Sequence, residues 1–150
     1  MLALAAPFAA AGSSVAAAAP GRAGDSPQRM KAIVRAWSDR LNARDNEGLA
    51  SLYAVPAVVI QAPFLYRLRT RAEVASWYAG LPCAGHVVSI TVRGRFATAV
   101  FRLANRGSSP CDAPGTLAAA RFEIAHGKIL SWEQVAVPKQ KLKAPTPSEA

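Results

Sequence analysis

The chain has 150 residues, of which about half are hydrophobic and 18% are charged, and its formal net charge is +9. This composition excludes a disordered chain, a long repeat array and a polytopic membrane protein, and it fits one soluble domain with its own core. The first twenty residues include ten alanines and no charged side chain, so all eighteen basic and nine acidic residues come later. The chain thus divides into an uncharged leader and a basic domain.

Residues 1–19 have the character of a signal peptide or a disordered leader. An apolar run ends in small residues, and Ala17 and Ala19 fit the −3 and −1 positions of a cleavage site. No lysine or arginine directly follows Met1, so the basic start of a signal peptide is missing. Either the true start lies upstream or the leader is simply disordered. We expect a secreted or cell-envelope bacterial protein.

The two cysteines, Cys83 and Cys111, are 28 positions apart, which is not a metal-binding spacing. Two Cys and two His spread over different elements also argue against a zinc site. In an exported chain such a pair indicates a disulfide, worth about 3–4 kcal/mol for a loop of this length. The alternative is two buried free thiols. We predict no metal and no cofactor.

The first predicted helix follows a linker at residues 20–26. Ser26 supplies a cap, Pro27 suits the first helical position, and apolar residues from Met30 to Leu41 recur at helical spacing. Asp45 then predicts a short second helix, which carries Leu49, Leu52 and Tyr53 and ends at Pro56. A short buried strand is predicted at residues 58–60.

A capping box at Thr70 and Glu73 predicts a third helix over residues 71–81. From Val87 onward the apolar period changes to two, which predicts strands at 87–93, 96–104, 117–125 and 128–137. His126-Gly127 fits a tight turn between the last two strands. Residues 27–137 thus form an α+β domain, and residues 138–150 are read as a disordered basic tail.

Several stretches of this domain resemble the nuclear transport factor two-like superfamily, especially its SnoaL-like and ketosteroid-isomerase-like branches. They are the long helix and the short helix up to Leu52-Tyr53, the helix that ends in Trp77-Tyr78, and the late segment from Phe122 to Trp132. The resemblance implies a cone-shaped, curved antiparallel sheet packed on a long N-terminal helix with two shorter helices. It also implies an apolar pocket and, often, a homodimer.

The catalytic positions that the resemblance implies are not filled. Isomerase-like members use a carboxylate base after the first strand, a tyrosine on the first helix and an acid in a late strand. Counted from Asp45, these positions hold Gln61 or Ala62, then Trp37, and a residue within Ala118–Ala120. Hydrolase-like relatives need an Asp–Arg–Asp set that activates water. The four aspartates of this chain lie in the predicted linker, on or after the first helix, or in a loop, so they do not supply this set. We predict no catalytic residue.

Glu123 and Glu133 are the only carboxylates in the predicted strands. With His126-Gly127 as the turn, Glu123 pairs with Leu130 and Glu133 with Ala120, which places the two carboxylates on opposite faces. Arg121 and Glu123 share a face, with Trp132 opposite Arg121. This group predicts either a polar patch at the floor of the pocket or a surface salt bridge with a stacked arginine.

The leading hypothesis is an exported, non-catalytic domain that binds a small apolar ligand or a protein partner. One alternative is an isomerase-like or hydrolase-like enzyme with a non-standard site, whose first suspects are Arg121, Glu123 and His86. Another is a basic module for an anionic cell-envelope surface; the dispersed charges argue against nucleic acid. The predicted pocket residues are Trp37, Tyr53, Gln61, Phe64, Tyr66, Trp77, Arg121 and Trp132.

Overall fold

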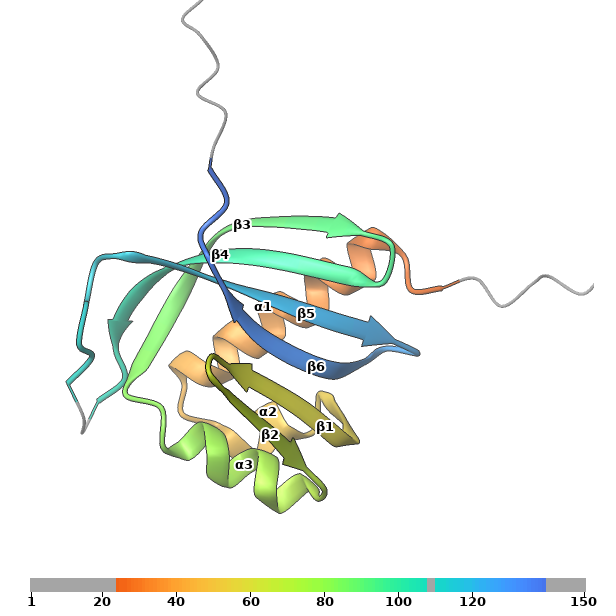
Figure 1. The fold of residues 1–150 in the computed structure, drawn as a ribbon, viewed down its shortest axis with the longest axis horizontal. Helices are drawn as coiled ribbons and strands as arrows, with labels where there is room; N and C mark the ends of the chain where they lie inside the picture. Colours follow the sequence, from red (N-terminus) through yellow and green to blue (C-terminus); the bar gives the residue numbers. More distant parts are fainter. Residues whose placement is uncertain (1–23, 108–109, 140–150) are drawn as a thin grey trace, which may run out of the picture.

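The structure is a computed structural model that describes residues 24–107 and 110–139. Within these ranges lie three helices and six strands, and the six strands form one open, curved sheet (Figure 1). In chain order the elements are α1 (Pro27–Asn42), α2 (Asn46–Ala50), β1 (Tyr53–Gln61), β2 (Phe64–Leu68), α3 (Arg71–Ala79), β3 (Cys83–Arg93), β4 (Phe96–Asn105), β5 (Leu117–Ala125) and β6 (Lys128–Val135).

The strand order across the sheet is β2-β1-β6-β5-β4-β3, and every neighbouring pair is antiparallel except β1 and β6. Helix α1 packs against one face, called the inner face here, while α2 and α3 lie together near β1 and β2 (Figure 1). This arrangement confirms the predicted α+β class and the long N-terminal helix on a curved sheet. No helix in the described part of the chain is long and apolar enough to cross a membrane.

Helix α1 begins where the sequence predicts. The Ser26 side chain accepts a hydrogen bond from Arg29 N at 3.2 Å, and Pro27 occupies the first turn. The face that carries Met30, Val34, Trp37 and Leu41 is buried. Trp37 is the centre of this core, because its ring contacts the rings of four aromatic residues: Tyr78, Phe101, Phe122 and Trp132.

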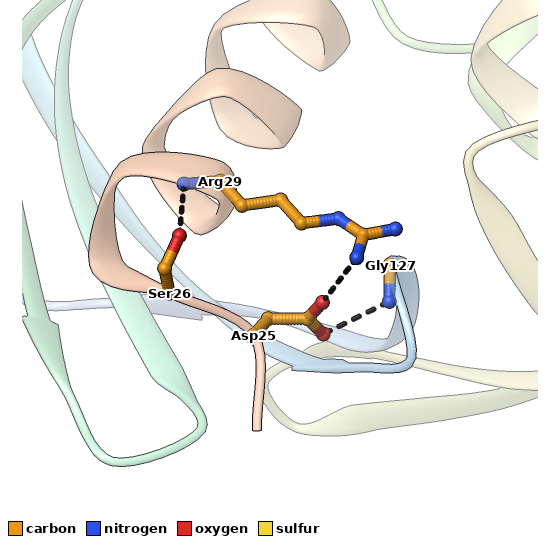
Figure 2. Close-up of polar contacts among 4 residues, drawn as sticks. All are labelled: Asp25, Ser26, Arg29 and Gly127. Carbon is orange, nitrogen blue, oxygen red and sulfur yellow. Dashed lines mark hydrogen bonds and ion pairs between the residues drawn. The ribbon is translucent and has the colours of Figure 1, made fainter. Parts of the chain in front are cut away.

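The N-terminal end of α1 is anchored by a residue that the sequence placed in the linker. Figure 2 shows the Asp25 carboxylate between two partners, the Gly127 amide and the Arg29 guanidinium. Gly127 N donates to Oδ2 at 2.9 Å, and the ion pair to Arg29 spans 3.3 Å. Only 3% of the Asp25 side chain is exposed. The carboxylate therefore joins the start of α1 to the predicted His126-Gly127 turn, which has the positive φ angles expected of it.

Two predicted boundaries are wrong near the second helix. Helix α2 ends at Ala50, and Tyr53 begins strand β1, in which Pro56 also lies. The helical spacing of Leu49, Leu52 and Tyr53 is outweighed by pairing, since Tyr53 lies opposite Ile129 of β6. The β1–β6 register shifts between Tyr53 and Val58, and Pro56, which has no N–H to donate, falls inside this gap.

Strand β2 is absent from the predicted elements. It pairs with β1, with Gln61 opposite Phe64 and Ile60 opposite Leu65. At this edge Phe64, Leu65 and Tyr66 are all exposed, so the alternation that reveals a half-buried strand is missing. Strand β3 also starts four residues before the predicted Val87.

The leader at 1–19, most of the linker and the tail beyond residue 139 lie outside the described residues. The structure therefore has no bearing on the predicted signal peptide. The described segment ends just after β6, at Lys139.

Candidate functional site

A cavity of about 270 Å³ lies on the inner face of the sheet, beside α1. Its walls come from α1, the strands β1 and β3–β6, the connection that precedes β3 and the loop after Cys111. Alanine is the commonest residue in the wall, and the small side chains leave the space that larger ones would fill. The lining residues are Trp37, Leu41, Gln61, Leu81, Pro82, Cys83, Ala84, Gly85, Phe101, Leu103, Asp112, Ala113, Ala118, Ala119, Ala120, Trp132 and Gln134.

One indole group gives this cavity its hydrogen-bonding potential. Nε1 of Trp132 is buried and has no hydrogen-bond partner, whereas the buried Nε1 of Trp37 is directed at the hydroxyls of Tyr53 and Tyr78. The two rings stack with a centroid separation of 6.3 Å. Buried N–H donors without a partner are rare and unfavourable in folded proteins. Both residues line the cavity, so a ligand atom that accepts a hydrogen bond from Nε1 of Trp132 would relieve the cost.

Two glutamine side chains add polar groups to the wall of the cavity. Gln61 Nε2 donates to Gln134 Oε1 at 3.1 Å, which joins β1 to β6. The titratable group in the lining is Asp112, and this residue is exposed. Among the described residues that form the wall, therefore, no charged group is buried. The interior can supply apolar contact and hydrogen bonds.

A disulfide holds one wall of the cavity in place. Cys83, at the start of β3, is bonded to Cys111, with their Cα atoms 4.6 Å apart. This confirms the predicted pairing. Asn105 Oδ1 also accepts a hydrogen bond from Cys111 N at 2.9 Å. The disulfide fixes the loop that brings Asp112 and Ala113 to the cavity.

Arg106 supports the same loop from the other side. Its guanidinium donates to the backbone carbonyls of Leu41 and Tyr78 and to the side chain of Asn46. The side chain is buried, and desolvation, followed by repulsion from Arg44, lowers its pKa. A buried arginine bound to carbonyls at the ends of α1 and α3 positions the wall and lies outside the lining.

Asn42 and Ser38 of α1 secure the edge strand β3 where it lines the cavity. Asn42 accepts a hydrogen bond from Gly85 N at 3.1 Å and donates to Gly85 O at 3.0 Å, and Ser38 donates to the same carbonyl at 2.8 Å. These bonds satisfy backbone groups that an edge strand leaves unpaired. A Cβ at Gly85 would stand 3.0 Å from Phe101 Cβ, so the glycine permits close approach of the two strands.

A pair of buried tyrosines lies beside the cavity. The hydroxyls of Tyr53 and Tyr78 are hydrogen bonded to each other. Burial raises the pKa of both phenols, while the indole of Trp37 lowers it. Both side chains stay protonated at neutral pH, and neither belongs to the lining residues.

The structure brings three of the predicted pocket residues together: Trp37, Gln61 and Trp132. Tyr53 and Trp77 instead belong to the aromatic core, where Trp77 contacts Trp132 and Tyr78. Phe64 and Tyr66 lie on the edge strand β2 and are exposed. Arg121 lies on the outer face, away from the cavity.

The predicted register of the last hairpin is wrong by one residue. A bulge between Glu123 and Ile124 pairs Arg121 with Glu133 and Glu123 with Ser131. Both carboxylates therefore lie on the same, outer face, contrary to the prediction, and Trp132 lies opposite Phe122 instead of Arg121. The predicted register holds only for the two pairs next to the turn, Ala125 with Lys128 and Ile124 with Ile129. Beyond them the bulge shifts the pairing by one residue.

These groups form surface ion pairs. Arg121 Nη2 is bonded to Glu133 Oε2, and Arg95 Nη2 lies 2.9 Å from Glu123 Oε1. A surface salt bridge with a stacked arginine is present, but its members differ from the predicted group: Arg121 pairs with Glu133 instead of Glu123 and lies 5.4 Å from the centroid of the Phe96 ring instead of beside Trp132. His86 is exposed, opposite Arg102 on the outer face. The enzyme suspects Arg121, Glu123 and His86 are therefore all outside the cavity.

The sequence reasoning missed the wall formed by residues 81–85 and 111–113. The signal was present, because the predicted disulfide necessarily brings these two segments together. Of the positions that the resemblance pointed to, Trp37, Gln61 and Ala118–Ala120 lie in the wall of the cavity. Across residues 24–107 and 110–139, no three His, Cys, Asp or Glu side chains gather in a way that could hold a metal ion.

No protein-family model and no curated protein matches this sequence. Solved structures do match. A proposed polyketide cyclase from Sinorhizobium meliloti is 19% identical, with a TM-score of 0.60 over 72% of this chain and 99% of the other. A proposed ketosteroid isomerase from Kribbella flavida is 18% identical, with a TM-score of 0.58 over 81% and 93%.

A third structure, from Catenulispora acidiphila, has a ketosteroid-isomerase-like fold and contains trimethylamine; it is 16% identical, with a TM-score of 0.54 over 75% of this chain and 87% of that one. These likenesses define the class of the fold. The chain has a nuclear transport factor two-like fold, as the resemblance implied.

Proposed function

We propose that this protein binds one small, neutral and largely apolar molecule in the inner-face cavity, and that it acts as a binding protein without catalysing a reaction. The observation that carries the proposal is the apolar cavity together with the buried, partnerless indole N–H of Trp132, one of its lining residues. Such a wall selects a ligand with an apolar body and a hydrogen-bond acceptor, for example a ketone or an ether.

The size of the cavity limits the ligand. A dry cavity of about 150 Å³ accommodates benzene in another protein. The volume of about 270 Å³ here therefore fits a molecule of roughly two fused rings. A charged ligand is disfavoured because no buried group of opposite charge is available to the cavity among the described residues.

The carboxylate-free interior supports binding over catalysis. The positions where isomerase-like proteins carry a base, a tyrosine and an acid hold Gln61, Trp37 and alanine. Without a titratable group inside, the cavity has no candidate for proton abstraction. The exposed Asp112 lies on a loop held by the disulfide. The possible catalytic residues Arg121, Glu123 and His86 lie on the outer face of the sheet, on the opposite side from a ligand in this cavity.

We also propose that the protein works in an oxidising compartment outside the cytoplasm. The Cys83–Cys111 bond supports this, since disulfides persist mainly in such environments, and the alanine-rich leader fits export. Mass spectrometry of the unreduced chain recovered from the producing cells tests both points. A chain that keeps residues 1–19 and carries two free thiols contradicts the export proposal.

The binding proposal is tested with two matched molecules, 2-acetylnaphthalene and its near-isostere 2-isopropenylnaphthalene, in which a CH₂ replaces the carbonyl oxygen. Quenching of tryptophan fluorescence reports binding, because Trp37 and Trp132 line the cavity. We expect the ketone to bind about tenfold more tightly, which corresponds to one hydrogen bond to a buried donor. Equal affinities would contradict a role for the Trp132 indole donor.

Two variants locate the binding. Ala120→Phe fills the inner-face cavity and should abolish binding of the ketone, whereas Thr98→Phe adds the same ring to the outer face of the neighbouring strand and should preserve it. Ala118→Leu provides a milder obstruction if Ala120→Phe unfolds. Circular dichroism checks the fold of each variant. Binding that survives both obstructions overturns the assignment of the cavity.

A further inference from the structure

A second hollow lies on the opposite, outer face of the sheet. It has a volume of about 480 Å³, and its floor consists of side chains from β3, β4 and β5. The register places them on one face, because Ser89 lies opposite Val100, Thr91 opposite Thr98, and Thr98 opposite Arg121. We name this hollow the outer groove; it is lined by Ser89, Thr91, Arg93, Phe96, Thr98, Val100, Arg121, Pro138 and Lys139.

The outer groove is positively charged. It contains Arg93, Arg121 and Lys139 and no carboxylate. Arg121 is neutralised by Glu133 next to the groove. Arg93 and Lys139 have no ion-pair partner among residues 24–107 and 110–139, and both are exposed. Two cations therefore remain available to an anion that lies between them.

The floor of the groove supplies hydroxyl groups and one aromatic ring. Ser89, Thr91 and Thr98 can donate hydrogen bonds to anionic oxygens. The ring is Phe96, and the guanidinium carbons of Arg95 and Arg121 already lie over it at 5.7 and 5.4 Å from its centroid. Stacking on an aromatic ring is the usual way to hold a base, and a base would compete with these two cations for Phe96, which favours a ligand without bases.

The chain continues from this groove with further positive charge. After Lys139 the sequence adds Lys141 and Lys143, with Glu149 as the one acidic residue. Figure 1 shows the segment after β6 crossing the strands of the sheet on its way out of the fold. Its residues Pro138 and Lys139 form one side of the groove. A recessed site with a wall of this kind suits a chain that lies in it, whereas a flat bilayer would contact only its rims.

We propose that the outer groove binds a linear phosphate polymer without rings, held by Arg93 and Lys139 and by the hydroxyls of Thr91 and Thr98. The inference concerns a different face from the ligand cavity and is independent of the proposed function. A polymer is favoured over a single phosphate ion because the cations Arg93, Arg121 and Lys139 come from three different segments around the groove.

The experiment measures binding of short-chain inorganic polyphosphate by the full chain at two salt concentrations. Arg93→Gln/Lys139→Gln should raise the Kd about tenfold and should reduce the slope of log Kd against log salt by about two. The matched control, Lys31→Gln/Arg35→Gln, removes the same charge from the exposed surface of α1, on the other side of the sheet, and should change the Kd less than twofold.

Three results would overturn the proposal. The first is an equal loss of affinity in the two double variants, which would mean that net charge alone attracts the polymer. The second is binding of single-stranded DNA or of phosphatidylglycerol vesicles as tight as that of polyphosphate and equally dependent on Arg93 and Lys139. The third is no polyphosphate binding by the unaltered chain. The thermal unfolding midpoint of each variant checks that the fold is retained.

Discussion

The two faces of the sheet are built by the same strands and differ in almost every physical property. Along β4, Ala97 and Ala99 are fully buried on the inner face, whereas Thr98 between them faces the outer groove. Along β5, Phe122 is fully buried and the neighbouring Arg121 is half exposed in an ion pair. One residue step therefore separates an apolar cavity from a basic groove, and each face can carry a separate binding role.

The largest expected contrast is between two adjacent residues of β5. Phe122→Ala removes a fully buried ring that contacts Trp37 and Phe101, and it should lower the free energy of unfolding by about 4 kcal/mol. Arg121→Ala breaks a surface ion pair and should cost about 0.5 kcal/mol. Urea denaturation followed by circular dichroism measures both. Similar costs would mean that the two faces are not energetically distinct.

The disulfide gives the second contrast, because it borders the cavity and not the groove. Cys83→Ala/Cys111→Ala should lower the free energy of unfolding by about 3 kcal/mol. The freed loop no longer fixes Asp112 and Ala113, so binding of 2-acetylnaphthalene should weaken while polyphosphate binding stays unchanged. Denaturation and the two titrations check this. A loss of polyphosphate binding in the folded variant would show that the faces are coupled.

The smallest effect concerns the Tyr53–Tyr78 pair behind the cavity. Burial raises the pKa of both phenols above the ordinary value of 10.0, so the folded state keeps protons that the unfolded state loses near that pH. This contribution to stability is complete below pH 10 and declines as the pH rises above it. The unaltered chain should lose about 2 kcal/mol more per pH unit above pH 10 than Tyr53→Phe/Tyr78→Phe does, because each of the two phenols contributes. Parallel pH profiles would contradict the assignment.

Local patterns in the sequence were sufficient to predict most of the elements and the disulfide. The side chains of Ser26 and Thr70 cap their helices as expected. The return bond of the capping box differs, because the Glu73 carboxylate accepts a hydrogen bond from Arg69 N instead of from Thr70 N. Strand β2 could not be predicted because exposed apolar side chains conceal its alternation. The helix caps and the strand alternation are local features whose signals lie within a few residues, whereas the disulfide followed from the presence of just two cysteines.

The errors about the site have a longer-range origin. The bulge at Glu123 depends on how β5 and β6 pair, and one extra residue moves Glu133 and Arg121 to the same face and Trp132 to the other. The same dependence explains why Arg121 was assigned to the pocket. Trp37 and Gln61, which were assigned by position in a known fold, do lie in the cavity wall. The partnerless state of the Trp132 indole is a property of the assembled cavity, which no sequence pattern reports.

The most direct test of the central claim is a crystal structure of the chain soaked with 2-acetylnaphthalene. We predict one molecule in the inner-face cavity, with its carbonyl oxygen about 2.7–3.2 Å from Nε1 of Trp132. A cavity filled by ordered water, or a ligand bound only on the outer face, would contradict the proposal that the inner face binds a small neutral molecule.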